Sequence, residues 1–154
     1  MQIMVDAPAP CERRRLVEEA LQRPADETLD HVEAGPYLEK WLVHKDGEGN
    51  ARYVHRFLRS DQDDEMHDHP WDNITICVSG GYWNVTPTGR FWIAPGDIVR
   101  RAAAEFHRVE LEPGIQPITI FDHGPKINDW GFLLENGTKM PWAQFCEQSL
   151  MYRR

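Results

Sequence analysis

Short segments with apolar residues at alternate positions dominate the middle of the chain. Residues 37–45 and 51–58 have this pattern, and the Asp-Gly-Glu-Gly-Asn between them suits a tight hairpin. Further short apolar segments, separated by turns that contain Gly or Pro, lie at 73–80, 81–86, 90–94, 97–101, 107–111 and 116–123. Many short strands at close spacing predict an all-β barrel or sandwich.

The two ends of the chain have helical patterns instead. Residues 10–22 predict a helix, because Pro10 suits its first turn and a narrow apolar stripe follows. Residues 141–154 predict a closing helix with Pro141 near its start. The sequence therefore predicts one domain, made of an N-terminal helical extension (1–36), a β-barrel (37–140) and a C-terminal helix packed on the barrel (141–154).

The composition is that of a soluble globular protein, with 41% hydrophobic and 27% charged residues among 154. The net charge of -8 argues against binding to nucleic acid or to an acidic membrane, since both need a basic patch. The short Arg clusters at 13–15 and 100–101 are interpreted as solvated faces. Three widely spaced cysteines, with no signal peptide and no membrane-spanning segment in the sequence, predict reduced thiols in a cytoplasmic protein.

His67-Asp68-His69 is the first candidate for chemistry. On a strand, residues two apart point to the same face about 7 Å from each other, so both imidazoles can reach one ion. The alternative is a polar outer face beside the acidic loop that precedes them. A third histidine, His107, follows the turn at Pro95-Gly96, a short strand and a small-residue corner. On a neighbouring strand of a barrel it would complete a three-His face.

These residues resemble the two motifs of the cupin superfamily. The first motif, G-x5-H-x-H-x3,4-E-x6-G, places its histidines on His67 and His69 and its last glycine on Gly80. The second motif, G-x5-P-x-G-x2-H-x3-N, begins at Gly96 and reaches His107 without a gap. The resemblance implies a jelly-roll β-barrel with short terminal helices.

The chain departs from both motifs at several positions. Asn73 stands where the first motif has glutamate, and Asp61 stands in place of its opening glycine. In the second motif the usual proline, glycine and asparagine are Ala102, Ala104 and Leu111.

By this resemblance His67, His69 and His107 would bind one divalent metal. Imidazole suits Fe, Zn and Ni, and Fe(II) is preferred here over Zn, Mn or Ni because three-His cupins include non-haem Fe(II) dioxygenases. Asn73 is a weak ligand or an outer residue of the site. Asp72 is a substitute carboxylate, although strand alternation turns it to the opposite face.

A polar inner face is expected beside the metal, with Asn73, Thr75 and Cys77 on one side of their strand and Ile74 and Ile76 packed on the other. Candidates for the substrate pocket are Tyr53, His55, Arg56, Thr75, Cys77 and His123. For each of them a packing, surface or turn role is the alternative.

Three functions remain open from the sequence. The first is a dioxygenase-like Fe(II) enzyme that acts on a small polar molecule. The second is a Zn-, Mn- or Ni-dependent isomerase, lyase or hydrolase, in which His123 or Tyr53 moves a proton. The third is a non-enzymatic ligand-binding cupin. Fold analogy also suggests a homodimer.

Overall fold

The computed structural model describes residues 7–31, 34–61, 64–145 and 147, which form one helix and eleven strands. The helix is α1 (Pro10–Leu21). The strands are β1 (Glu27–His31), β2 (Gly35–Lys45), β3 (Ala51–Phe57), β4 (Asn73–Ser79), β5 (Tyr82–Thr86), β6 (Gly89–Ile93), β7 (Ile98–Arg101), β8 (Arg108–Glu110), β9 (Ile118–His123), β10 (Gly131–Leu133) and β11 (Lys139–Pro141).

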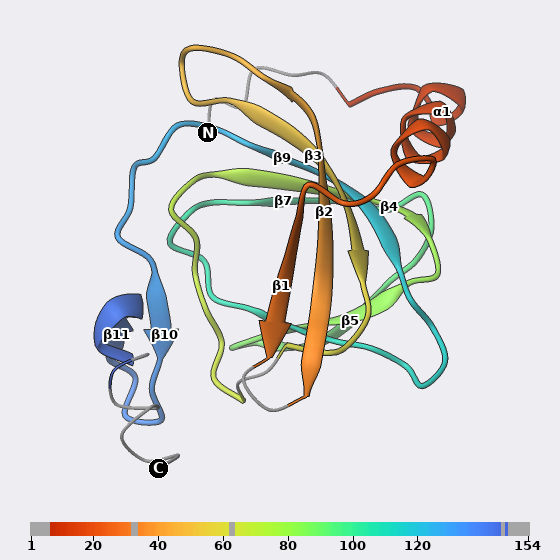
Figure 1. Cartoon of the computed structure of the whole chain (residues 1–154). Coiled ribbons are helices and arrows are strands. Elements are labelled where there is room, and N and C mark those ends of the chain that lie inside the picture. The colour runs from red at the N-terminus through yellow and green to blue at the C-terminus, as the bar shows by residue number, and fades with distance from the viewer. Residues whose placement is uncertain (1–6, 32–33, 62–63, 146, 148–154) are drawn as a thin grey trace.

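The strands form three antiparallel sheets. The large sheet has the order β1-β2-β3-β9-β4-β7, the second has the order β6-β5-β8, and β10 and β11 form a separate hairpin. Figure 1 shows α1 and the β10–β11 hairpin on different sides of the barrel. The pairing of β9 between β3 and β4 joins segments far apart in sequence, as in a jelly roll.

The outer face of the large sheet carries the main hydrophobic core. Val17 and Ala20 of α1 pack there, and the sheet supplies Trp41, Val54, Ile74, Ile76 and Ile120. Val54, Ile74 and Ile120 lie on neighbouring strands and are almost fully buried. This confirms that Ile74 and Ile76 pack on the side opposite to Asn73.

Strand alternation gives the large sheet a mostly polar and aromatic inner face. One row across this face consists of His123 of β9, Asn73 of β4 and Arg101 of β7, which are in register. The next row contains Phe121 and Thr75. The inner face therefore brings together residues from strands that are distant in the sequence.

The turn from β4 to β5 needs glycine at two positions. Gly80 and Gly81 have φ angles of 86° and 102°, in the left-handed region. A Cβ atom on Gly81 would lie 2.5 Å from Cζ2 of Trp92. The predicted end of the strand at this glycine pair is confirmed.

Three sequence predictions need correction. The extension over 1–36 is not purely helical, because Glu27–His31 pairs with β2 at the edge of the large sheet. Arg101 is buried, so the 100–101 cluster is not a solvated face, although Arg100 is exposed. Strand β11 extends to Pro141, and a helical segment begins only at Trp142; residues 146 and 148–154 of the predicted closing helix lie outside the described residues.

Candidate metal centre

Backbone pairing joins the two histidine segments. The N–H of His67 donates to the carbonyl of His107 at 2.8 Å, and the N–H of His107 donates back to the carbonyl of His67 at 2.9 Å. The N–H of His69 donates to the carbonyl of Ala103 at 2.9 Å. This short antiparallel bridge brings together the two motifs recognised in the sequence.

The three imidazoles face one another. One potential ligand nitrogen from each of His67, His69 and His107 lies within 4.8 Å of the other two. The ring centroids are 4.8 Å apart for His67 and His107 and 5.0 Å apart for each of the other pairs. This arrangement could hold one metal ion, as the motif spacing predicts.

The protonation states of His69 and His107 suit metal ligands. Burial is the main cause that lowers the pKa of both His69 and His107 well below the usual value, so both are neutral at pH 7. The Oδ1 atom of Asn84 lies 2.6 Å from Nδ1 of His107 and can only accept, so Nδ1 donates and Nε2 keeps its lone pair. The buried Nδ1 of His69 has no hydrogen-bond partner.

Asp61 supports His67 from outside the cluster. Its Oδ2 atom lies 3.8 Å from Nδ1 of His67 and accepts the backbone N–H of Val109 at 2.7 Å. The distance of 3.8 Å is too long for a hydrogen bond, so Asp61 acts on His67 through its charge. Neither Asp61 nor Asn84 was predicted as a site residue; the replacement of the motif glycine by Asp61 was the one available signal.

Asn73 is fully buried and both ends of its amide are engaged. Its Oδ1 atom accepts from Nη1 of Arg101 at 2.8 Å, and its Nδ2 atom donates to the carbonyl of Trp71 at 3.2 Å. These bonds favour an outer role for Asn73 over that of a ligand. Asp72 accepts the backbone N–H of Ala103 at 2.9 Å and is not part of the histidine cluster.

Aromatic side chains extend from the histidine cluster along the inner face. His69 lies 6.3 Å from Trp71 and 6.4 Å from Phe121, measured between ring centroids. Trp71 stacks on His123 at 4.0 Å, and His55 stacks on Phe121 at 4.9 Å. Tyr53 lies between His55 and His123, with ring centroids 5.9 and 6.0 Å away.

Trp71 and Phe121 thus lie between His69 and the candidate pocket residues His55 and His123, which with Tyr53 form the next group of rings. His55 is buried, and burial lowers its pKa to about 3. His123 is half-buried at the rim; burial lowers its pKa, and its Nδ1 atom lies 2.8 Å from the carbonyl of Gly124.

The other pocket candidates have different positions. Thr75 is buried on the inner face opposite Phe121. Cys77 belongs to a second hydrophobic cluster with Tyr82, and burial raises its pKa to about 11, which favours the packing alternative over a reactive thiol. Arg56 forms an ion pair with Glu39 at 2.7 Å on the outer face, so it points away from the site.

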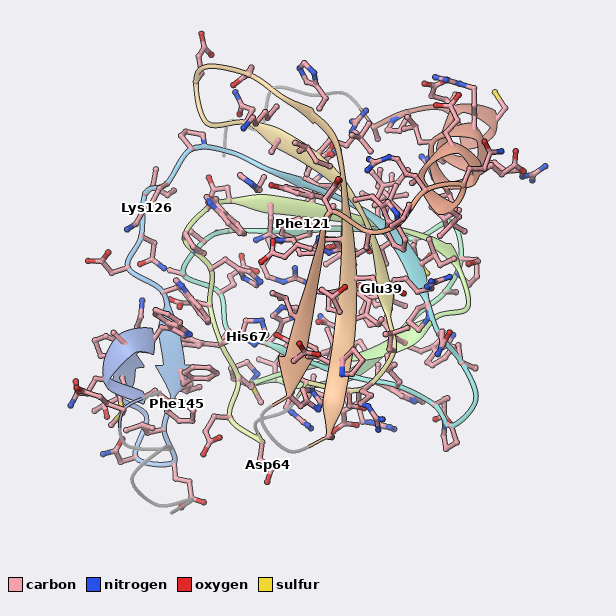
Figure 2. All side chains as sticks on the ribbon, viewed as in Figure 1. Glu39, Asp64, His67, Phe121, Lys126 and Phe145 are labelled. Carbon is pink, nitrogen blue, oxygen red and sulfur yellow. The ribbon has the colours of Figure 1, made fainter. Side chains whose placement is uncertain are left out.

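Asp68, between the two metal-site histidines, faces the other way and holds the C-terminal hairpin. Its carboxylate accepts from the backbone N–H of Gly131 at 2.7 Å, Nδ2 of Asn128 at 3.0 Å and Nζ of Lys139 at 2.7 Å. Phe132 of β10 consequently lies 6.4 Å from His67, between ring centroids. Figure 2 shows His67 on the side of the barrel nearest to this hairpin and Phe145.

Comparisons with known proteins show likeness in structure only. No family model matches the sequence, and no curated protein is significantly similar to it. The structure resembles a cupin 2 conserved barrel domain protein from Rhodopseudomonas palustris, with 9% identity over 71% of this chain and 77% of that chain and a TM-score of 0.58. It also resembles a candidate mannose-6-phosphate isomerase from Ralstonia eutropha JMP134 (17% identity, 65% and 93% covered, TM-score 0.54) and ectoine synthase from P. lautus (15% identity, 81% and 80% covered, TM-score 0.50).

These likenesses confirm the predicted fold: the chain is a cupin-type jelly-roll barrel. Its inner face carries a three-His cluster that could hold a metal ion. In the described part of the chain, no helix is both long and apolar enough to cross a membrane. A fold of this kind hosts many activities, so function must be argued from the site.

Proposed function

We propose that this chain is a mononuclear metalloenzyme that binds Fe(II) through three histidines and acts on a small polar molecule in a dioxygenase-like reaction. The proposal rests on one observation. In the described part of the chain, His67, His69 and His107 converge, and no carboxylate belongs to their cluster. Three neutral ligands leave three positions of an octahedral ion open, enough for substrate and O2. A bound Fe(II) ion would supply the redox chemistry that makes O2 reactive towards the substrate.

The surrounding residues support this role. The hydrogen bond to Asn84 fixes the ring of His107, which reduces the reorganisation needed when an ion binds. The rings of Trp71 and Phe121, 5.9 Å apart between centroids, provide an apolar surface next to His69. Because His123 is neutral at pH 7 and its Nδ1 atom donates to a carbonyl, its Nε2 atom can accept a proton from a bound molecule.

The neutral His123 also favours a second candidate function. With Zn, Mn or Ni in place of iron, the metal would act as a Lewis acid and His123 would move the proton in an isomerase, lyase or hydrolase reaction. One of the structural neighbours, the candidate mannose-6-phosphate isomerase, has a name of this reaction type. A ligand-binding cupin without activity is the third candidate. A homodimer and a cytoplasmic location stay predictions.

Oxygen consumption by the metal-loaded protein separates these candidates. Fe(II)-loaded protein should consume O2 with at least one member of a panel of small thiols, diketones and aromatic acids, and Zn-loaded protein should not. The exposed His44 provides a control variant, His44→Ala, which should behave like the wild type, whereas His107→Ala should be inactive. Turnover that persists without O2, or with Zn, would support the Lewis-acid function instead.

A further inference from the structure

Arg101 at the end of β7 is a buried cation that forms no contact ion pair in the described residues, although the carboxylates of Glu105 and Asp61 act on it from a greater distance. Only 3% of its surface is exposed, and its Nη1 atom donates to Oδ1 of Asn73 at 2.8 Å. Its Nη2 atom is buried and has no hydrogen-bond partner. In the described ranges, no carboxylate forms an ion pair with this guanidinium. A guanidinium has five N–H donors, so most of its binding capacity is unused.

The two other charged side chains that are buried in the described residues both form ion pairs, whereas Arg101 does not. Asp122 is 1% exposed and binds Arg52 through two bonds of 2.7 and 2.8 Å. Asp68 is equally buried and binds Lys139 at 2.7 Å. Burying an unpaired charge is costly, and proteins keep such groups mainly where a ligand completes them.

The position of Arg101 connects it to the three-His cluster. It is in register with Asn73, so both side chains share the inner face. Two residues after Arg101, the carbonyl of Ala103 accepts the backbone N–H of His69 at 2.9 Å, so the end of β7 lies beside the histidine segment. A divalent ion held by three neutral histidines would add two positive charges to that of Arg101, and the carboxylates of Asp61 and Glu105 would offset part of them.

Two further polar atoms on the same face lack partners. Thr119 and His55 are cross-strand neighbours, and the Oγ1 atom of Thr119 and the Nε2 atom of His55 are buried without a hydrogen bond. These atoms can satisfy the polar groups of a ligand that enters the barrel. One guanidinium balances the single charge of a carboxylate, whereas a phosphate group carries about two charges and three strong acceptor oxygens.

We propose that Arg101 is the anion anchor of the site and that the substrate is a small organic acid, whose carboxylate binds Nη2 of Arg101 while the rest of the molecule faces the histidine cluster. This inference rests on the proposed function, because it names the substrate class of the same site. Asn73 then acts as a positioning residue that aims the guanidinium. The role given to Asn73 also explains why asparagine can replace the motif glutamate here.

Pairs of a carboxylic acid and its uncharged amide test whether Arg101 binds the carboxylate. Acetate and glycolate are titrated into the metal-loaded and the metal-free protein beside acetamide and glycolamide, with calorimetry as readout and elemental analysis of each sample. Wild type should bind each acid more tightly than its amide. The variant Arg101→Gln should lose at least about tenfold in acid affinity with little change for the amides. Arg56→Gln, which removes an Arg from the outer face, is the control.

Stability supplies an independent readout. Because a ligand that binds only the folded protein stabilises it, glycolate should raise the Tm of wild type and not that of Arg101→Gln, whereas a merely structural Arg101 would lower the Tm of ligand-free protein and leave the rise with glycolate unchanged. Acids that bind no better than amides, or that bind Arg101→Gln as tightly as wild type, would overturn the proposal. So would inorganic phosphate that binds as tightly as the acids. If wild type holds no metal, the proposed function fails, yet acid binding that depends on Arg101 still supports the anchor.

Discussion

The substitution Asp68→Asn tests how the C-terminal hairpin is held near the candidate metal site. Asp68 is 1% exposed and receives hydrogen bonds from Gly131, Asn128 and Lys139. An asparagine can still accept the backbone N–H of Gly131 through its remaining oxygen. Its amide nitrogen cannot accept from Asn128 or from the ammonium of Lys139, so two of the three bonds are lost.

The cost can be estimated from these contacts. Removing one partner of a buried ion pair costs roughly 3–5 kcal/mol, and a hydrogen bond to a charged group contributes about 1.5–3 kcal/mol. Lys139 is 30% exposed, so water compensates part of its loss. We therefore expect a loss of about 3 kcal/mol in the free energy of unfolding. In a chain of this length that corresponds to a fall in Tm of about 6–12 °C.

Urea unfolding of Asp68→Asn, followed by tryptophan fluorescence, measures this loss directly. The control is Asp129→Asn in the same segment, whose side chain is 93% exposed and pairs with Lys126 at 3.5 Å. The control should change stability by less than about 0.5 kcal/mol. A loss for Asp68→Asn no larger than the control would refute the reasoning, because the buried carboxylate would then not hold the hairpin.

Three further predictions follow from other contacts. Asn84→Ala should weaken Zn binding about 10–100-fold in a chelator competition, because the ring of His107 loses its acceptor; equal affinity would contradict that role. Burial lowers the pKa of His55 to about 3 from 6.5, so between these pH values the unfolded chain binds a proton that the folded protein does not, and stability falls as pH falls. His55→Phe should flatten this dependence by up to ~1.4 kcal/mol per pH unit, measured by urea unfolding at several pH values in that window; an equal slope would count against it. Thiol labelling with mass spectrometry should modify the exposed Cys11 quickly and the buried Cys77 only after unfolding, and fast labelling of native Cys77 would contradict its burial.

The features that were predictable from sequence are those set by local pattern. Alternation placed Ile74 and Ile76 in the core and Asn73 opposite to them. The spacing of His67 and His69 predicted a shared direction, and the motif register predicted that His107 would join them. The first inference needs only the period of a strand. The histidines meet outside the named strands, where His67 makes isolated bridges to His107 and Phe132, so that prediction depended on the motif register.

Features that depend on tertiary partners were missed. The segment Glu27–His31 has few apolar residues and is mostly exposed, so only its pairing with β2 makes it a strand. Arg101 follows Arg100 in a pair that resembles a solvated face, but alternation turns one side chain out and the other into the barrel. Asp68 likewise has partners some 60 to 70 residues away, which no local pattern reveals.

The most direct test of the metal centre is elemental analysis of untagged protein loaded with Fe(II) and desalted without oxygen. Wild type and the control His44→Ala should each retain about one equivalent of metal, and His67→Ala and His107→Ala should retain almost none while staying folded. Wild-type protein that retains no metal, or histidine variants that retain as much as wild type, would contradict the claim that these three histidines form a metal site.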